Sequence, residues 1–272
     1  MEKNNNSLLE NKKKLTIIGV ILGVLLIVTI FLIFNENKEN YYIILDNHGI
    51  IEYKNNVYNY TENDKYLKSL YKVYNDNNYI GIYTIDKVDE FTKEIFFTNV
   101  ESKGSYAFEK PLLAFSDNIE KIDYKISDFT DSDFYLFNDI AMKSYIKDKN
   151  DLYDTSKIVL DFDNDNKNET LFTVTYEDLE SASIEIGENS YSIMYYMDDN
   201  GELTILAQGE PYYEEESILF PNYMIKTILD VNKDGVYEII VINRMHDEPI
   251  YEIYAIKDNR YTMVFATDLG GV

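Results

Sequence analysis

Two nine-residue segments, 161–169 and 230–238, place oxygen-bearing side chains at positions 1, 3, 5 and 9. Side chains at alternate positions of a tight loop can converge on one point, and Ca²⁺ takes about six to eight oxygen ligands in a flexible geometry. Grouped carboxylates repel one another unless a cation lies among them. The sequence therefore predicts two calcium sites. The predicted ligands are the side chains of Asp161, Asp163, Asp165, Glu169, Asp230, Asn232, Asp234 and Glu238 and the backbone carbonyls of Lys167 and Val236.

The flanking residues separate these segments from EF-hands. An EF-hand has a bidentate Glu at position 12 and a helix on each side, whereas position 12 here is Phe172 or Val241. The flanks are short and rich in β-branched residues, which predicts strand–loop–strand units. The predicted strands are 157–160, 171–176, 225–229 and 239–242. Position 6 needs a left-handed backbone, which Gly235 and Asn166 tolerate best.

Segment 230–238 matches the loop pattern D-x-[DN]-x-D-G-x-x-[DE] at every position, and 161–169 matches it except that Asn166 replaces Gly. Residues 157–272 therefore resemble the calcium-binding repeats of the FG-GAP/VCBS family, found in integrin α-chain propellers and many bacterial surface proteins. The Phe-Gly and Gly-Ala-Pro signatures of that family are not visible. The resemblance implies propeller blades and a role in cell-surface adhesion or assembly. The alternative interpretation is a pair of Asp/Asn-rich surface turns in an acidic protein.

The similarity between the two segments extends beyond the loops that begin at Asp161 and Asp230, since each loop is followed by a second strand pair. Asn200-Gly201 predicts a hairpin with a type I′ turn. The two strand pairs are 191–197 with 202–207, and 250–256 with 261–266. Each repeat is thus a predicted four-stranded meander, the shape of a propeller blade. The predicted fold class is mainly β, with residues 151–272 forming two calcium-loop repeats.

Residues 41–150 carry a mixed pattern, which predicts either a separate α+β region or degenerate blades with helical insertions. Apolar residues spaced i, i+3, i+4 and i+7 from Leu67 to Tyr74 predict an amphipathic helix. Phe134, Phe137 and Tyr145 predict a second helix that ends near Asn150. The predicted strands of this region are 41–45 paired with 50–53, and 79–85 paired with 94–98.

Residues 15–34 form an unbroken run without a charge. A stretch of about 20 apolar residues is long enough to cross the hydrocarbon core of a membrane as a helix. Lys12, Lys13 and Lys14 precede the run, so the positive-inside rule predicts a cytoplasmic tail at 1–14 and an extracellular chain after the linker 35–40. The predicted location is the cell membrane, with a single span. A cleaved signal peptide is the competing interpretation, although its apolar region is normally shorter and ends in small residues.

Acidic residues dominate the chain, which has 49 Asp and Glu against 25 Lys and Arg and a net charge of −24. Residues 41–272 alone carry a net charge of −25. Such a surface repels nucleic acid and anionic lipid, so we expect neither as a partner of this part of the chain. The chain has no Cys, so neither disulfides nor a lipoprotein anchor contributes to it.

Catalytic signatures are absent from the sequence. It contains no G-x-S-x-G and no H-E-x-x-H, and its two histidines, His48 and His246, lie in predicted loops. We therefore expect a membrane-anchored calcium-binding module with a protein or glycan ligand, not an enzyme. The alternative is an anchored enzyme acting on cell-wall or extracellular glycans, because paired carboxylates are plentiful. A third interpretation is an envelope subunit that pairs through Gly19 and Gly23 of the span.

Overall fold

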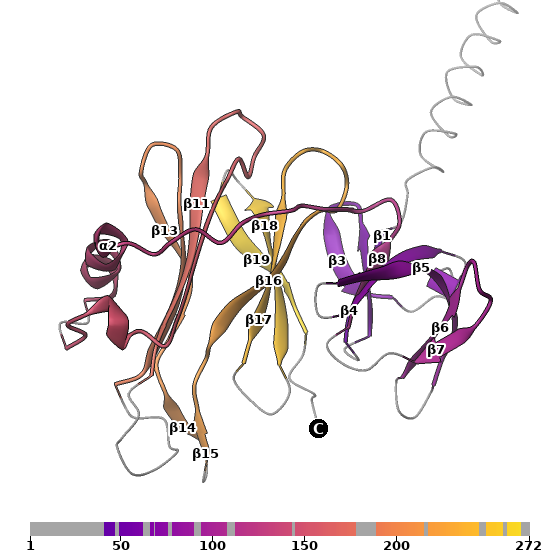
Figure 1. The fold of residues 1–272 in the computed structure, drawn as a ribbon, viewed down its shortest axis with the longest axis horizontal. Helices are drawn as coiled ribbons and strands as arrows, with labels where there is room; N and C mark the ends of the chain where they lie inside the picture. The colour runs from indigo at the N-terminus through magenta and orange to yellow at the C-terminus, as the bar shows by residue number, and fades with distance from the viewer. Residues whose placement is uncertain are drawn as a thin grey trace, which may run out of the picture. The chain divides into compact units, whose positions relative to one another are not determined.

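Antiparallel β-sheets make up nearly all of the structure, as the sequence predicts (Figure 1). The structure is a computed structural model. It describes residues 41–267 apart from 47–48, 62–65, 68, 76–77, 90–93, 108–111, 143–144, 178–188, 215–216, 245–248 and 258–259. Within these ranges no helix is long and apolar enough to cross a membrane. The predicted tail, span and linker of residues 1–40, like His48 and His246, lie outside the described residues.

The first sheet has eight strands in the order β3-β2-β1-β8-β4-β5-β6-β7. Its strands are β1 (Tyr41–Leu45), β2 (Ile50–Lys54), β3 (Val57–Tyr60), β4 (Leu70–Asn75), β5 (Asn78–Val88), β6 (Ile95–Asn99), β7 (Ser105–Ala107) and β8 (Leu112–Ser116). The predicted pairs β1–β2 and β5–β6 are confirmed. The central strands β1 and β8 are buried on both faces, which explains their continuous apolar sequence.

The predicted helix from Leu67 to Tyr74 is wrong, because Leu70–Asn75 is strand β4. Tyr71 and Val73 are both fully buried, so burial here has the period of two that a strand requires. A short apolar window fits both periods, and pairing of β4 with β8 and β5 decides between them. The elements that the structure describes from Tyr41 to Ser116 are the strands of this sheet, and the helix of the predicted mixed region 41–150 comes after them in sequence.

The two predicted meanders are confirmed as separate sheets. The four-stranded sheet contains β10 (Asp154–Leu160), β11 (Glu169–Tyr176), β12 (Tyr191–Met197) and β13 (Leu203–Gly209). The five-stranded sheet contains β9 (Glu120–Lys121), β16 (Tyr223–Asp230), β17 (Glu238–Asn243), β18 (Ile250–Lys257) and β19 (Arg260–Ala266). A short hairpin, β14 (Tyr212–Glu214) with β15 (Ser217–Leu219), lies between them in sequence. Among the described residues the sheets do not close into a propeller ring.

The hairpin between β12 and β13 uses a different turn from the predicted type I′. A type I′ turn needs positive φ at both central residues, but Gly201 alone has one here, at 83°. The Gly201 N–H donates to the Asp198 carbonyl at 3.0 Å, which makes Asp199 and Asn200 the central pair. Gly201 then follows in the left-handed conformation, as in a three-residue hairpin loop with a bulge.

The helix α2 (Asp131–Ala141) lies beside the four-stranded sheet (Figure 1). Thr130 caps it and exchanges hydrogen bonds with Asp133, whose carboxylate also pairs with Lys157 Nζ at 2.9 Å. The helix ends where Met142 turns left-handed, well before the predicted end near Asn150. The short 3₁₀ helix η2 (Lys149–Asp151) is a separate element.

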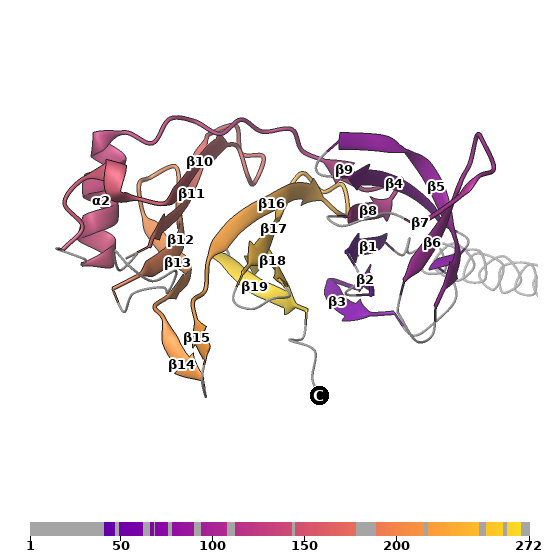
Figure 2. The same cartoon turned by 60° about the horizontal axis from the view of Figure 1, so that its bottom comes forward.

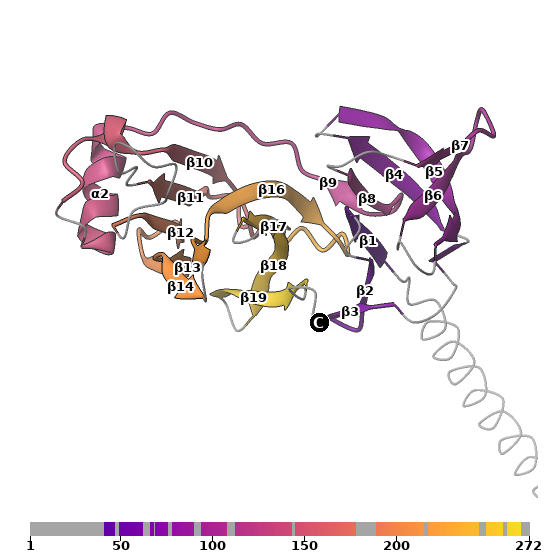
Figure 3. The same cartoon turned by 90° about the horizontal axis from the view of Figure 1, so that it is seen from below.

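The five-stranded sheet lies between the other two sheets (Figures 2 and 3). Alternate residues along its strands enter different cores. Leu229, Ile240 and Ile253 pack against the eight-stranded sheet, whereas Ile239 and Tyr254 pack against the four-stranded sheet. This two-faced burial fixes the strand register, since a slip of one residue would exchange the faces. It also fixes the ends of β16 and β17, the strands on either side of the second acidic segment.

Candidate metal centre

The two acidic segments form equivalent hairpin loops. Loop A, residues 161–169, joins the paired strands β10 and β11, and loop B, residues 230–238, joins β16 and β17. In both loops the position-9 Glu is the first residue of the second strand and is paired within the sheet. The predicted strand–loop–strand arrangement is therefore confirmed for both segments, and EF-hand helices do not flank either loop.

Both loops follow the same backbone path. Position 6 is left-handed as predicted, with φ of 70° at Asn166 and 84° at Gly235. Position 4 is left-handed too, with φ of 63° at Asn164 and 59° at Lys233. Sequence reasoning misses this second kink because Lys has no particular preference for it. The two left-handed residues turn the backbone amides toward the inside of each loop.

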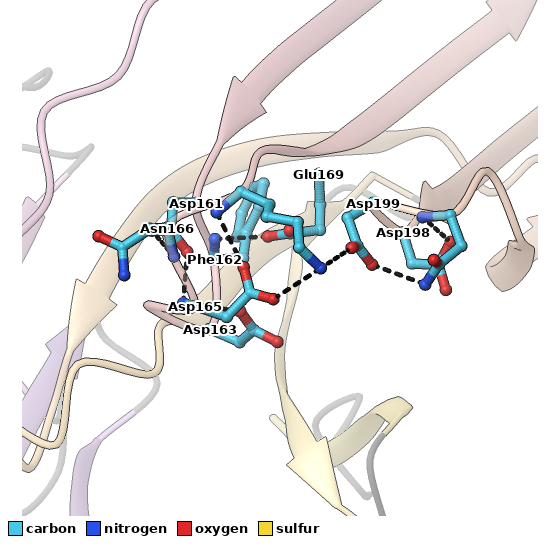
Figure 4. Close-up of polar contacts among 10 residues, drawn as sticks. Asp161, Phe162, Asp163, Asp165, Asn166, Glu169, Asp198 and Asp199 are labelled. Carbon is cyan, nitrogen blue, oxygen red and sulfur yellow. Dashed lines mark hydrogen bonds and ion pairs between the residues drawn. The ribbon is translucent and has the colours of Figure 1, made fainter.

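Those amides hold the acidic side chains in place through the same hydrogen bonds in each loop. In loop A, the N–H of Phe162 donates to Glu169 Oε2 at 2.7 Å, and the N–H of Asn166 donates to Asp161 Oδ2 at 2.9 Å. Asp165 N–H reaches Asp163 Oδ1 at 3.2 Å, and Figure 4 shows the resulting group. Glu169 and Asp163 each accept one of these bonds on a single oxygen, whereas Asp161 uses both of its oxygens, because its Oδ1 also accepts from the Asp165 N–H at 3.0 Å.

Loop B repeats three of these hydrogen bonds. The N–H of Val231 donates to Glu238 Oε2 at 3.0 Å, and the N–H of Gly235 donates to Asp230 Oδ2 at 3.1 Å. Asp234 N–H donates to Asn232 Oδ1 at 3.1 Å. The two loops therefore share side-chain geometry as well as sequence.

The loops differ in how far their acidic groups converge. In loop A one oxygen from each of Asp161, Asp163, Asp165 and Glu169 lies within 4.8 Å of the others, as a shared cation requires. Loop B brings together no such acidic group among the described residues, and a neutral Asn232 stands at its position 3. The carbonyl oxygens of Lys167 and Val236 stay predicted ligands.

Burial makes this negative charge costly. Glu169 is 3% exposed, and burial raises its pKa, with further increases from Asp163, Asp161 and Asp165. Burial likewise raises the pKa of Glu238 to about 7, against the hydrogen bond from Val231. Burial also raises the pKa of Asp230. A divalent cation would reverse all three shifts because it favours the ionised forms.

A cation fits the residues present on two grounds. The donor set is made of carboxylate and amide oxygens, which suit hard cations such as Ca²⁺, Mg²⁺ and Mn²⁺ and disfavour Zn²⁺ and Cu²⁺. In loop B the Oδ1 atom of Asp230 is buried and has no hydrogen-bond partner, although the residue is only 6% exposed. A buried carboxylate oxygen without a hydrogen-bond partner destabilises the folded protein unless a ligand, such as a cation, binds to it.

Further acidic residues, which the sequence reasoning assigns only to a turn, border loop A. Figure 4 places Asp198 and Asp199 beside the loop-A group, and Lys167 Nζ bridges Asp165 Oδ2 at 3.4 Å to Asp199. A cavity of about 370 Å³ lies here. Its five carboxylates are those of Asp163, Glu169, Asp198, Asp199 and Glu202, and Arg260 faces the same space.

A larger cavity borders loop B and brings in residues from the distant first sheet. We name it groove B; its volume is about 800 Å³. Residues from three places line groove B: Tyr53 and Tyr58 of the β2–β3 hairpin, Asn232, Asp234 and Glu238 of loop B, and Met263 of β19. Asn232 Nδ2 donates to the Tyr53 hydroxyl at 3.2 Å across 179 residues of sequence. No local sequence pattern signals such a contact.

No protein-family model, curated protein or solved structure matches this chain. The resemblance to FG-GAP/VCBS repeats therefore stays a prediction that rests on the residues of loops A and B.

The two loops pack against each other. The N–H of Tyr237 in loop B donates to the Phe162 carbonyl of loop A at 3.0 Å. Gly235 faces the side chain of Asn164, and a methyl group on Gly235 would lie 2.6 Å from the Asn164 amide nitrogen. Phe162 itself is fully buried against Tyr261 and Tyr196. The two candidate cation loops are thus neighbours, and changes in one loop reach the other through this contact.

This contact predicts that Gly235→Ala destabilises the protein by about 2 kcal/mol. A left-handed Ala costs about 1–2 kcal/mol, and the exposed Asn164 side chain must also move away from the added methyl group, which adds to that loss. Gly201→Ala is a matched control, because its φ of 83° is nearly the same and nothing lies within 4 Å of the added methyl. Urea unfolding should show a loss at Gly201 of about 1–2 kcal/mol. Adding Asn164→Gly to Gly235→Ala should recover the difference, and equal losses at both glycines would refute the contact.

Proposed function

We propose that this chain is a calcium-binding module of the cell surface, anchored in the membrane by residues 15–34 and acting in adhesion or envelope assembly. The observation that carries the proposal is the convergence of the four acidic side chains of loop A within 4.8 Å, on a backbone that loop B repeats. An isolated Asp/Asn-rich turn would give no reason for a buried Glu at position 9 in both loops.

Calcium is the cation that suits these loops best. Mg²⁺ demands a near-ideal octahedral geometry and keeps several waters, whereas Ca²⁺ accepts irregular sets of oxygens. Extracellular modules bind Ca²⁺ with dissociation constants of about 10⁻⁴–10⁻³ M, which suits calcium concentrations outside the cell. The ions would then be constitutive. Their role would be to hold the β10–β11 and β16–β17 turns in place in a chain without disulfides.

The binding role follows from where the ions would act. Each ion would fix one end of a strand pair and the loops beside it, including the cavity at loop A and groove B. The blade-like meanders support the same conclusion through the resemblance to propeller repeats. The predicted anchor and the net charge of −25 on residues 41–272 support a surface that lies outside the membrane and away from anionic partners.

Ion counting tests the proposal directly. Equilibrium dialysis of the full chain against ⁴⁵Ca²⁺ should give two bound ions, because each loop supplies its own oxygens. Asp161→Ala and Asp230→Ala should each remove one ion, and Asp139→Ala, an exposed acid on α2, should remove none. Protease added to intact cells should cleave residues 41–272 without lysis. Failure to bind Ca²⁺, or protection of this region until lysis, would refute the proposal.

A further inference from the structure

We infer that loops A and B bind their calcium ions cooperatively, because a backbone contact between Tyr237 and Phe162 joins ligand positions of the two loops. The inference rests on the proposed function, since it concerns the same two ions. It adds how the two sites are regulated, namely that filling one loop tightens the other. The protein would then fill over a narrower range of calcium concentration than two equal and independent loops.

The link between the loops begins with a peptide group that has a partner on each side. The Val236 carbonyl is the predicted position-7 ligand of loop B, and the N–H of the same peptide group is that of Tyr237. This N–H donates to the Phe162 carbonyl of loop A at 3.0 Å. The C=O and N–H of a trans peptide group point in opposite directions, so the Val236 carbonyl points away from loop A. An ion bound to that carbonyl would polarise the peptide group and strengthen its N–H as a donor.

Phe162 passes this contact on to the ligands of loop A. It lies between Asp161 and Asp163, which are both predicted ligands, and its own N–H donates to Glu169 Oε2 at 2.7 Å. Its side chain is fully buried, and close packing leaves the backbone at this position little freedom to shift. Any displacement of Phe162 would therefore reach three of the four acidic side chains that converge in loop A.

Two further contacts hold the loops against each other. The Tyr261 hydroxyl donates to the Tyr237 carbonyl at 2.7 Å, and the Tyr261 ring packs edge-on against Phe162 with the ring centroids 6.1 Å apart. Tyr261 is only 4% exposed, so this bridge lies inside the protein. Gly235 faces the Asn164 side chain at a distance that leaves no room for a methyl group. Tyr237 is thus held to loop A both directly and through Tyr261.

An unpartnered oxygen in loop B points to an ion there. Asp230 is buried and its Oδ1 atom has no hydrogen-bond partner, while the buried Glu238 adds a second carboxylate. Without a cation these charges repel each other and oppose the conformation of the loop. An ion in loop A would hold Phe162 in place, and with it the Tyr237 N–H, so the ion of loop B would have less of the backbone left to order. The coupling is reciprocal, because each ion changes the affinity of the other by the same factor.

Repulsion between the two ions opposes this effect. The loops are exposed to solvent at Asp163, Asp165 and Asp234, so water and salt screen the charges there, over a distance of about 8 Å at physiological ionic strength. Salt does not screen the hydrogen bond between Tyr237 and Phe162 in this way. We therefore expect the net coupling to be positive at physiological salt and to increase when KCl is added.

Calcium-binding curves of the full chain test this inference. Equilibrium dialysis against ⁴⁵Ca²⁺ gives the half-saturation concentration of the wild type and of Asp161→Ala and Asp230→Ala, each of which keeps one loop. The coupling factor is the factor by which filling one loop tightens the other, and we expect it to be about three- to tenfold, the effect of one hydrogen bond. The wild type should then reach half-saturation at a free Ca²⁺ concentration about two- to threefold below the geometric mean of the two single-loop variants.

A change of one backbone atom isolates the link. Replacing Tyr237 by its α-hydroxy acid, through nonsense suppression, turns the N–H into an ester oxygen and removes the bond to Phe162, while both loops keep their side chains. The matched control is the same replacement at Asn168, the equivalent position of loop A, whose N–H makes no hydrogen bond to loop B among the described residues. Both esters weaken the predicted carbonyl ligand at position 7 alike. The coupling factor, measured from the same three curves, should fall close to one in the Tyr237 ester and persist in the Asn168 ester.

The outcomes separate this inference from the proposed function. Two bound ions with a coupling factor of one would overturn the cooperativity and leave the calcium module standing. A coupling factor that the Tyr237 ester leaves unchanged would overturn this contact as the link. A factor below one that rises toward one with added KCl would show that repulsion between the ions prevails, and would also overturn the inference. Absence of bound Ca²⁺ would refute the proposed function itself.

Discussion

Calcium at 10 mM should raise the melting temperature of the full chain by about 10–20 °C relative to EDTA, and Mg²⁺ at the same concentration should raise it far less. A ligand present at 100 times its dissociation constant stabilises the native state by about 2.7 kcal/mol per site. Two sites with dissociation constants of about 10⁻⁴ M would therefore add about 5 kcal/mol. In a domain of this size, 1 kcal/mol corresponds to about 2–4 °C.

Variants of the two loops test whether they cause this rise in melting temperature. The quantity to compare is the difference between CaCl₂ and EDTA within each protein, because Asp161→Ala and Asp230→Ala also lose the hydrogen bonds to Asn166 and Gly235. Each variant should lose about half of the shift, and the double variant should lose all of it. Asp139→Ala, an exposed acid on α2, should keep the whole shift. An equal response to Mg²⁺, or a full shift in the double variant, would contradict calcium binding in these loops.

The parts of this site that can be predicted from the sequence are those encoded locally. Ligand spacing, the left-handed turn at position 6 and the flanking strands all depend on residues within one hairpin. The left-handed turn at Lys233 escapes sequence reasoning because a surface Lys gives no sign of a positive φ, although Asn164 at the same position of loop A tolerates one. The turn type at Gly201 is ambiguous for a related reason, since Asn-Gly fits several hairpin loops.

Long-range pairing accounts for the rest. The apolar residues around strand β4 fit the spacing of a helix as well as that of a strand. Pairing of β4 with β5 and β8 selects the strand, and this pairing depends on residues far away in the sequence. The contact between Gly235 and Asn164 depends on two sheets lying side by side. Tyr58 reaches the neighbourhood of loop B from a hairpin near the start of the described residues, through the shared core of the first and five-stranded sheets. Sequence spacing holds no information on such neighbours.

The buried Glu238 predicts an unusual pH dependence for the protein in EDTA. Burial raises the pKa of its carboxyl to about 7, from 4.5 for an ordinary Glu, so between these values the folded state binds more protons than the unfolded state. Stability from this group is complete below pH 4.5 and is lost as the pH rises through 7. Between pH 5 and pH 7.5 the loss should be about 2 kcal/mol.

Glu238→Gln isolates this effect, because Gln keeps an oxygen for the Val231 N–H and carries no charge. In EDTA the variant should be more stable than the wild type by about 3 kcal/mol at pH 7.5 and by only about 1 kcal/mol at pH 5. In 10 mM CaCl₂ the order should reverse at pH 7.5, because the ion favours the ionised carboxylate that the variant lacks. Urea unfolding at both pH values measures these differences, with Glu101→Gln on the exposed β6–β7 turn as the control. If Glu238→Gln destabilises the calcium-free protein equally at both pH values, then Glu238 holds loop B by hydrogen bonding alone and not as a charge awaiting a cation.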